Sequence, residues 1–242
     1  MTFQTIAGIY VPAITAEQMR DVDRVAMERF DFGILQMMEN AGRSLAQNAM
    51  EMLRLSPGPV VVLAGSGGNG GGGLCCVRHL HNHGISVDVA LSKEPAALDG
   101  AAARQLGTLR QAGLEALDPG QVEETLRDAA LVVDALIGYS LHGAPRGRVA
   151  ALIELCNRHA RRVLSLDLPS GLDATTGEAP GRVVAPERTL TLALPKTGLA
   201  EVEGEVYLAD IGIPPAVFES IGIAYEPPFE QGYWVRIERV GG

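Results

Sequence analysis

Two aspartates stand at the ends of short apolar runs, where a carboxyl group is well placed to do chemistry. Asp134 follows the run 131–133, and Asp167 follows the run 163–166. A carboxylate among apolar neighbours must be paired, hydrogen-bonded or bound to a cation, and its pKa can rise into the range useful for proton transfer. Both are therefore candidate functional residues, with turn formation or helix capping as the alternative interpretation.

A glycine-rich segment is the second candidate. Residues 65–73 contain seven glycines in nine positions, directly after the apolar run 60–64 and before a predicted helix. Glycine lets a ligand approach the backbone, and a helix N-terminus offers free N–H groups and a positive dipole end. This arrangement predicts an anion site, with phosphate as the best fit. No lysine follows the glycines, so the segment is not a Walker A loop. The alternative is a flexible connector.

Oxygen-bearing side chains follow three of the apolar runs. Asn69, Asp134 and Ser170 can supply the oxygen ligands that hard cations choose. The role of Lys196 stays open, because it can reach the same pocket or point outward. His142 is interpreted as a solvated loop residue, although it can also contact a ligand. The histidines at 79, 81 and 83 are interpreted as a surface face.

The elements that must position these residues alternate along the chain. Short apolar runs predict strands, and helix-length segments separate most of them. The predicted strands cover 60–64, 85–91, 130–136, 162–168 and 189–194, and the predicted helices between them cover 74–83, 96–112 and 149–159. This order indicates an α/β protein with a doubly wound, mainly parallel sheet, in which ligands bind at the carboxyl ends of the strands.

The chain begins with two further predicted helices. Thr15 and Gln18 form a capping box, so a helix should run from Thr15 to about Arg29, and an apolar stripe predicts a second helix over 34–53. No linker or internal repeat divides the sequence, which favours one domain over 1–242. The stretch 227–242 is interpreted as an edge strand or a tail.

Composition excludes several classes of protein. The 242 residues carry 20 basic and 29 acidic side chains, a net charge of −9, which disfavours nucleic-acid binding. No apolar run reaches the length of a membrane span. Three cysteines cannot form a disulfide framework, and the first twelve residues do not resemble a secretory signal. We therefore expect a cytoplasmic protein with no membrane partner.

Five ordered motifs resemble one family. They are the segments 38–43 (MENAGR), 65–73 (GSGGNGGGG), 134–143 (DALIGYSLHG), 166–173 (LDLPSGLD) and 193–199 (ALPKTGL). Over residues 14–215 the chain resembles the NAD(P)H-hydrate epimerase family, the YjeF N-terminal domain, which also contains the apolipoprotein A-I-binding protein. Three positions depart from the family's pattern: Gly68 stands where the family has Asn, Gly72 where it has Asp and, as a milder change, His142 where it has Lys.

The resemblance implies a three-layer αβα, Rossmann-like fold and a homodimer. It implies a potassium ion held by Asn69, Asp134 and Ser170, and it makes Asp167 the catalytic acid–base candidate. It also implies that substrate is contacted by Gly68, Asn69, Gly70, Gly71, Gly72, Gly138, Tyr139, Ser140, Leu141, His142, Gly143, Ala144 and Asp167.

The activity that the resemblance implies is an isomerase reaction in cofactor repair. It interconverts the R and S forms of hydrated NADH and NADPH (NADHX and NADPHX), and a separate NAD(P)H-hydrate dehydratase then acts on the S form. The nucleotide would be a substrate and not a hydride carrier. Because of Gly68 and Gly72, two alternatives stay open: a non-catalytic nucleotide-binding or scaffold member, and a related enzyme acting on another phosphorylated metabolite.

Overall fold

A nine-stranded sheet forms the centre of the molecule. The computed structural model describes residues 2–230 and 232–240 of the chain. The strand order is β2-β1-β9-β8-β7-β6-β5-β3-β4. The six strands from β8 to β4 are parallel to one another, and the remaining pairs are antiparallel. The α/β class with a mainly parallel sheet is therefore confirmed.

The parallel strands are the apolar runs seen in the sequence. They are β3 (Val60–Ala64), β4 (Val87–Leu91), β5 (Leu131–Ala135), β6 (Val163–Leu166), β7 (Arg188–Leu192) and β8 (Glu205–Ala209). Every residue of β3 and β5 is buried, because helices cover both faces of the sheet there. The strand β8 has no counterpart among the predicted elements.

The direction of winding reverses at β3. From β3 the chain crosses to β4 on one side, and it then returns to place β5 on the other side of β3, so that Val62 pairs with both Val89 and Val133. In doubly wound sheets a crevice opens outside the carboxyl ends of the two strands at such a switch point. The segments that follow β3 and β5, beginning at Gly65 and Leu136, border this crevice.

Two helices precede the first parallel strand. They are α1 (Ala16–Arg29) and α2 (Ile34–Leu53). The predicted capping box is confirmed, since Thr15 Oγ1 accepts from Gln18 N and Gln18 Oε1 accepts from Thr15 N. Their buried positions recur at helical spacing, for example Met19, Val22 and Val25 in α1.

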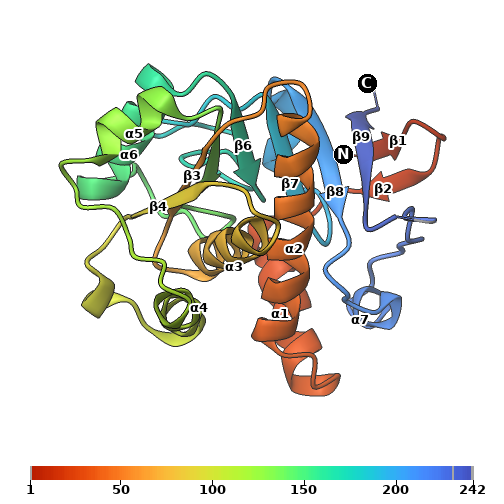
Figure 1. Ribbon diagram of the computed structural model, residues 1–242. Helices are drawn as coiled ribbons and strands as arrows, with labels where there is room; N and C mark the ends of the chain where they lie inside the picture. Colours follow the sequence, from red (N-terminus) through yellow and green to blue (C-terminus); the bar gives the residue numbers. More distant parts are fainter. Residues whose placement is uncertain (1, 231, 241–242) are drawn as a thin grey trace.

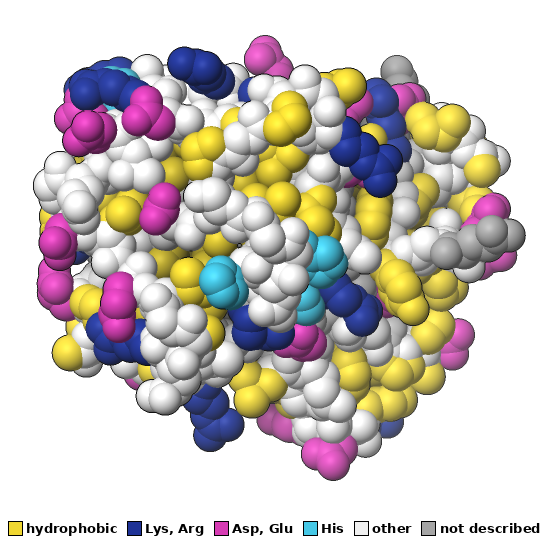
Figure 2. Space-filling view, viewed as in Figure 1, with side chains coloured by type: hydrophobic (Ala, Val, Ile, Leu, Met, Phe, Trp, Pro, Cys, Tyr) yellow, Lys and Arg dark blue, Asp and Glu magenta, His cyan; other side chains and the backbone are white. Residues whose placement is uncertain are grey.

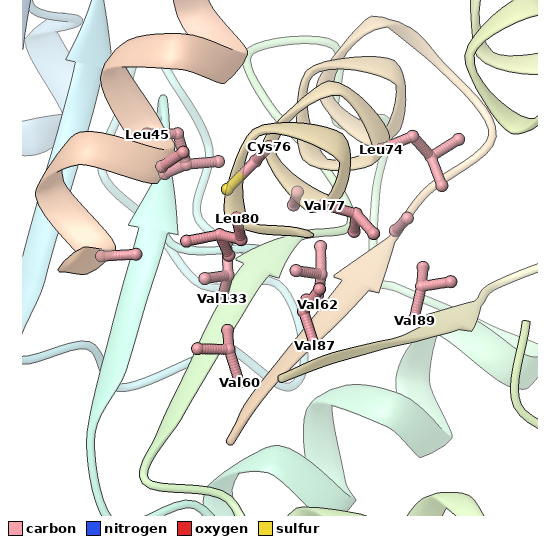
Figure 3. Close-up of a cluster of buried hydrophobic side chains, with 14 of the residues drawn as sticks. Leu45, Val60, Val62, Leu74, Cys76, Val77, Leu80, Val87, Val89 and Val133 are labelled. Carbon is pink, nitrogen blue, oxygen red and sulfur yellow. The ribbon is translucent and has the colours of Figure 1, made fainter. Parts of the chain in front are cut away.

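The remaining helices complete the layers on the two faces of the sheet (Figure 1). They are α3 (Gly68–Asn82), α4 (Gly100–Gln111), α5 (Val122–Asp128), α6 (Gly147–His159) and α7 (Pro215–Glu219), with short 3-10 helices at Pro95–Ala97 and Thr197–Glu201. One core cluster joins α2, α3 and α4 to the sheet, and Figure 3 shows Leu74, Val77 and Leu80 of α3 beside strand valines. Another cluster packs α5 and α6 against the opposite face.

The helix after the glycine-rich segment begins earlier than the sequence predicts. It starts at Gly68 and not at Leu74, so most of the glycines are helical. They permit close packing: a Cβ atom on Gly70 would lie 1.8 Å from the Gly65 carbonyl oxygen, and one on Gly73 would lie 2.6 Å from Ala135 Cβ. Tertiary contacts thus override the low helix propensity of glycine.

The N-terminal and C-terminal strands extend the sheet. They are β1 (Thr2–Thr5), β2 (Tyr10–Pro12) and β9 (Trp234–Arg239). The prediction that 227–242 holds an edge strand or a tail is only half right. The segment does contain a strand, but β9 pairs with β8 on one side and β1 on the other, so it is interior. No helix within 2–230 and 232–240 is long and apolar enough to cross a membrane.

Candidate functional site

A cavity of about 640 Å³ lies at the carboxyl edge of the parallel sheet. Its floor is formed by residues that follow β3, β5 and β6, which are the strands around the switch point. One wall is apolar and comes from α1 and α2. The main lining residues are Met19, Arg20, Asp23, Arg24, Met37, Met38, Ala41, Ser66, Gly67, Gly68, Asn69, Gly72, Gly138, Tyr139, Ser140, Leu166, Asp167, Leu192 and Lys196.

Asp167 lies on the floor of this cavity in a strained backbone conformation. It follows β6 directly, and its φ of 67° is rare for a residue other than glycine. The turn is closed by Leu168 N, which donates to Leu166 O at 2.8 Å. The side chain is 3% exposed yet lines the cavity. Backbone strain held in place at a cavity points to function.

Lys196 is the charge partner of Asp167. Its Nζ lies 2.5 Å from Asp167 Oδ1 and also donates to the carbonyl of Leu192. Asp167 accepts two further hydrogen bonds, from the backbone N–H groups of Tyr139 and Leu192. The sequence left the direction of Lys196 open. The structure shows that it points inward and is 1% exposed.

Asp134 and Ser170 form a buried cluster next to this floor. Ser170 Oγ lies 2.5 Å from Asp134 Oδ1, and Ser170 N lies 2.9 Å from Oδ2. Ser165 Oγ and Leu136 N also donate to the carboxylate. Burial raises the pKa of Asp134, although these hydrogen bonds act to lower it. The two predicted cation ligands are therefore in direct contact, but neither lines the cavity.

Asn69 approaches the same loop from the start of α3. A Cβ atom built on Gly138 would lie 3.2 Å from Asn69 Oδ1 and 3.0 Å from Asp167 Oδ2, so both polar groups face this glycine. Asn69 Nδ2 is buried and has no hydrogen-bond partner among the described residues. An unpartnered buried amide at a cavity wall suggests a missing ligand. The neighbouring Ile137 O and Ser170 Oγ lie 3.2 Å apart.

The predicted substrate-contacting residues fall into two groups. Six of them line the cavity besides Asp167, namely Gly68, Asn69, Gly72, Gly138, Tyr139 and Ser140. Six do not, namely Gly70, Gly71, Leu141, His142, Gly143 and Ala144. Gly70 and Gly71 are buried within α3, where they permit close packing, and His142 and Gly143 are exposed in the loop after β5.

Helix α1 contributes residues that the sequence analysis missed. Arg20, Asp23 and Arg24 line the cavity, and the hydroxyl of Tyr139 donates a hydrogen bond to Asp23. Burial raises the pKa of Asp23, and the hydrogen bond from Tyr139 only partly opposes this shift. In the sequence these charged residues look like an ordinary solvated helix face, so no local signal separates them from Glu17 or Glu28.

A second polar cluster lies away from the cavity. Glu39 of α2 contacts His79 at 2.8 Å, Arg78 at 2.5 Å and the Cys75 thiol at 3.3 Å. Figure 2 shows histidines beside basic and acidic side chains on this face. Burial raises the pKa of Cys75 to about 12, so the thiol stays protonated. Because the Arg78 guanidinium already contacts both Glu39 and Cys75, this cluster is an ion-pair network.

The fold and the cavity define the class of protein. It is a doubly wound α/β protein with a cavity at the carboxyl edge of its sheet and a buried carboxylate–lysine pair on the floor of that cavity. Sequence comparison identifies the family. The family described as "YjeF-related protein N-terminus" matches residues 34–198, and this chain belongs to it.

Similar proteins support this assignment. The NAD(P)H-hydrate epimerase of Dehalogenimonas lykanthroporepellens is 48% identical over 98% of this chain and 97% of its own length. The protein of the same name from Truepera radiovictrix is 37% identical over 93% and 100%. A bifunctional NAD(P)H-hydrate repair enzyme of Salinibacter ruber is 37% identical, over 86% of this chain and 42% of its own.

A solved structure has the same fold. The crystal structure of the yeast protein ynu0 superposes with a TM-score of 0.80 at 24% identity, covering 93% of this chain and 100% of the yeast chain. At this identity the likeness supports the three-layer Rossmann-like architecture and carries no argument about activity.

Proposed function

We infer that this chain is an NAD(P)H-hydrate epimerase, an isomerase that interconverts the R and S forms of hydrated NADH and NADPH. Near full-length identity to proteins of that name supports the inference. The observation that carries it is the Asp167–Lys196 pair, which places a proton-handling carboxylate on the floor of a cavity large enough for a nucleotide.

We propose that the start of α3 binds the pyrophosphate of the substrate. The first intrahelical bond runs from Gly71 N to Gly67 O, so the N–H groups of Gly68 and Asn69 have no partner within the helix. Gly67 and Gly68 leave open space beside the backbone, where an anion can approach. The apolar wall of Met19, Met37 and Met38 suits a hydrated nicotinamide ring.

We propose Asp167 as the catalytic base and acid. Hydration of an enamine leaves a hydroxyl on the carbon bonded to nitrogen, and inverting that carbon requires a proton to leave one oxygen and return to another. Lys196 fixes the carboxylate and compensates its charge. The strained backbone directs the side chain toward the cavity.

We propose a potassium ion beside this pair, held by Asn69, Asp134 and Ser170. The donor set fits, since it offers one carboxylate and otherwise neutral oxygens: Ser170 Oγ contacts the Asp134 carboxylate, and Asn69 Oδ1 faces the neighbouring Gly138. Hydrogen bonds from Ser165 and Ser170 occupy the Asp134 oxygens, so the ion would displace at least one of them. When bound, it would neutralise Asp134 and fix the loop that carries Tyr139.

Potassium is expected to stabilise the folded protein, because an ion that binds only the native state raises its apparent stability. The melting temperature should rise when potassium chloride replaces tetramethylammonium chloride at equal ionic strength. The variant Ser170→Ala should lose this increment. An equal melting temperature in both salts would contradict the proposed ion site.

We further propose that a separate NAD(P)H-hydrate dehydratase consumes the S form. Bifunctional repair enzymes occur among the relatives, and this chain spans 42% of the one from Salinibacter ruber. The homodimer and the cytoplasmic location stay predictions.

The activity is tested with purified protein, the R form of NADHX and an S-specific dehydratase. We expect the protein to accelerate consumption of the R form well beyond the spontaneous rate. No acceleration would favour a non-catalytic member or an enzyme for another metabolite. In that case Gly68→Asn is informative: its side chain enters open space, and a gain of turnover would show that only the loop residue was missing.

A further inference from the structure

A second carboxyl group, that of Asp23, borders the same cavity, and it lies at the other end of Tyr139 from Asp167. Asp23 projects from α1, lines the cavity and accepts a hydrogen bond from the Tyr139 hydroxyl. The backbone N–H of Tyr139 donates to Asp167 at 3.2 Å. One residue therefore connects two carboxyl groups, with Asp167 at its backbone end and Asp23 at its phenol end.

The two carboxyl groups have opposite surroundings. Asp167 is in contact with an ammonium group and two backbone N–H donors, all of which stabilise its anion. Asp23 has no salt bridge among the described residues, and its one hydrogen bond comes from Tyr139. Burial raises the pKa of Asp23, which keeps its proton to higher pH than a solvated aspartic acid. Paired acid and base groups in enzymes are separated by environment in this way.

We propose that Asp23 is a second acid–base residue of the epimerase reaction, acting on the face of the substrate opposite to Asp167. The inference rests on the function proposed above. Epimerisation by loss of a hydroxyl requires departure from one face and return at the other. One carboxyl group on the cavity floor serves only one of these faces, which is why a second group is needed.

The carboxylic acid of Asp23 protonates the substrate hydroxyl, the C–O bond breaks, and water leaves with the bonding electron pair. The lone pair of the ring nitrogen forms a C=N bond. A second water then adds to the opposite face while its proton passes to the Asp167 carboxylate, and the C=N electron pair returns to nitrogen. In the reverse direction Asp167 is the acid and Asp23 the base.

The charged groups that face Asp23 determine how its proton responds to pH. They are Tyr139, which is hydrogen-bonded to Asp23, and the charges of Lys196 and Asp167. Arg20 and Arg24 of the same helix also line the cavity. The hydrogen bond from Tyr139 and the charge of Lys196 lower the pKa of Asp23, and the charge of Asp167 raises it. Activity that needs protonated Asp23 must fall as pH rises through this pKa.

The test compares Asp23→Asn with Glu17→Gln, an exposed residue on the same helix outside the cavity. Asparagine keeps an acceptor for Tyr139 but cannot donate a proton to a leaving group. We expect kcat/KM of Asp23→Asn to fall by about 10²–10⁴-fold, equally in both directions because the equilibrium is fixed. Glu17→Gln should match the wild type, and circular dichroism should confirm that both variants fold.

Two further readouts separate catalysis from a structural role. The fall in kcat/KM at high pH should be present in the wild type and absent in Asp23→Asn. In ¹⁸O-labelled water the wild type should incorporate one ¹⁸O atom per epimerisation, above the spontaneous rate. Retention of the original oxygen, or full activity of Asp23→Asn, overturns the inference. Inactive wild-type protein would instead overturn the proposed function.

Discussion

Lys196 is one of only two lysines in the chain, and its ammonium group is buried. An ion pair that is cut off from water stabilises little, but loss of one partner leaves an isolated buried charge. Removal of Lys196 should therefore leave the carboxylate of Asp167 as an unpaired buried charge.

The substitution Lys196→Met is expected to lower the free energy of unfolding by about 3–5 kcal/mol and kcat by at least about 100-fold. The matched control is Lys93→Met, at an exposed position outside the cavity. It should change neither quantity. Urea titration and the coupled assay measure the two effects. Similar stability of both variants would show that Asp167 does not depend on the ammonium group.

The raised pKa of Asp23 predicts how stability changes with pH. A folded-state pKa above the unfolded value of about 3.8 means that burial opposes the anion, so this group's contribution to stability is present below 3.8 and lost as pH rises through the folded pKa. The variant Asp23→Asn has no carboxyl group to ionise, so its stability does not fall for this reason as the pH rises. Relative to wild type, the variant should therefore become more stable between about pH 3.5 and about pH 7.

Urea titrations of the two proteins at both pH values measure this difference. Glu17→Gln serves again as the control, since its side chain is exposed. A stability difference between Asp23→Asn and wild type that does not change with pH would show that Asp23 titrates as a solvated carboxyl.

At the residue scale, the sequence predicted those site residues that follow apolar runs. Asp134 lies in the last two residues of β5, and Asp167 and Ser170 follow β6, so all three come near strand ends, which meet at one edge of a parallel sheet. Asp23 was not predicted, because its role depends on how α1 packs across the sheet edge. That contact joins residues 116 positions apart, Asp23 and Tyr139, and leaves no periodic signal.

Helices α2 and α3 pack so closely that a glycine is required between them. A Cβ atom on Gly42 would lie 2.5 Å from Cys75 Cβ and 2.9 Å from the Gly72 carbonyl oxygen. Because backbone cannot yield as a flexible side chain does, the helices would have to separate. The glycine therefore sets the position of α3, whose first turn borders the cavity.

The substitution Gly42→Ala is expected to reduce the free energy of unfolding by about 1–3 kcal/mol. The same substitution in α4, Gly107→Ala, meets nothing within 4 Å and should stabilise by about 0.5–1 kcal/mol through helix propensity. Thermal and urea unfolding of both variants provide the comparison. A stabilising Gly42→Ala would contradict the close packing.

At the element scale, local signals set what could be predicted. The α1 start was correct because its capping box lies within four residues. The predicted start of α3 was wrong. The glycines look like a loop in the sequence, but they are helical because other parts of the chain pack closely against Gly70 and Gly73. Strands β1 and β8 were missed because buried and half-buried residues alternate in them and form no continuous apolar run, and β2 was missed because it has only three residues.

The whole sheet depends on β9, which joins the parallel strands to the N-terminal hairpin. Ile237 pairs with Val206 on one side and Thr5 on the other, and it is 2% exposed. Loss of this side chain should weaken the packing of β9 beside both of its neighbours, β8 and β1.

We expect Ile237→Ala to cost about 2–5 kcal/mol of unfolding free energy. Glu238→Ala, at the neighbouring exposed position of the strand, should stay within about 0.5 kcal/mol of wild type. Urea titration checks both values. Equal effects of the two substitutions would show that β9 is not an interior strand.

The pairing of β1 with β9 also has a consequence during synthesis on the ribosome. Phe3 finds its partner, Arg239, only after all the residues between them have been translated. Likewise Asp23 is made early and Lys196 late, yet both border one cavity. A nascent chain that has not yet reached Lys196 therefore cannot form the Asp167–Lys196 pair. The strand β1 can therefore pair with β9 only after the parallel strands have been made.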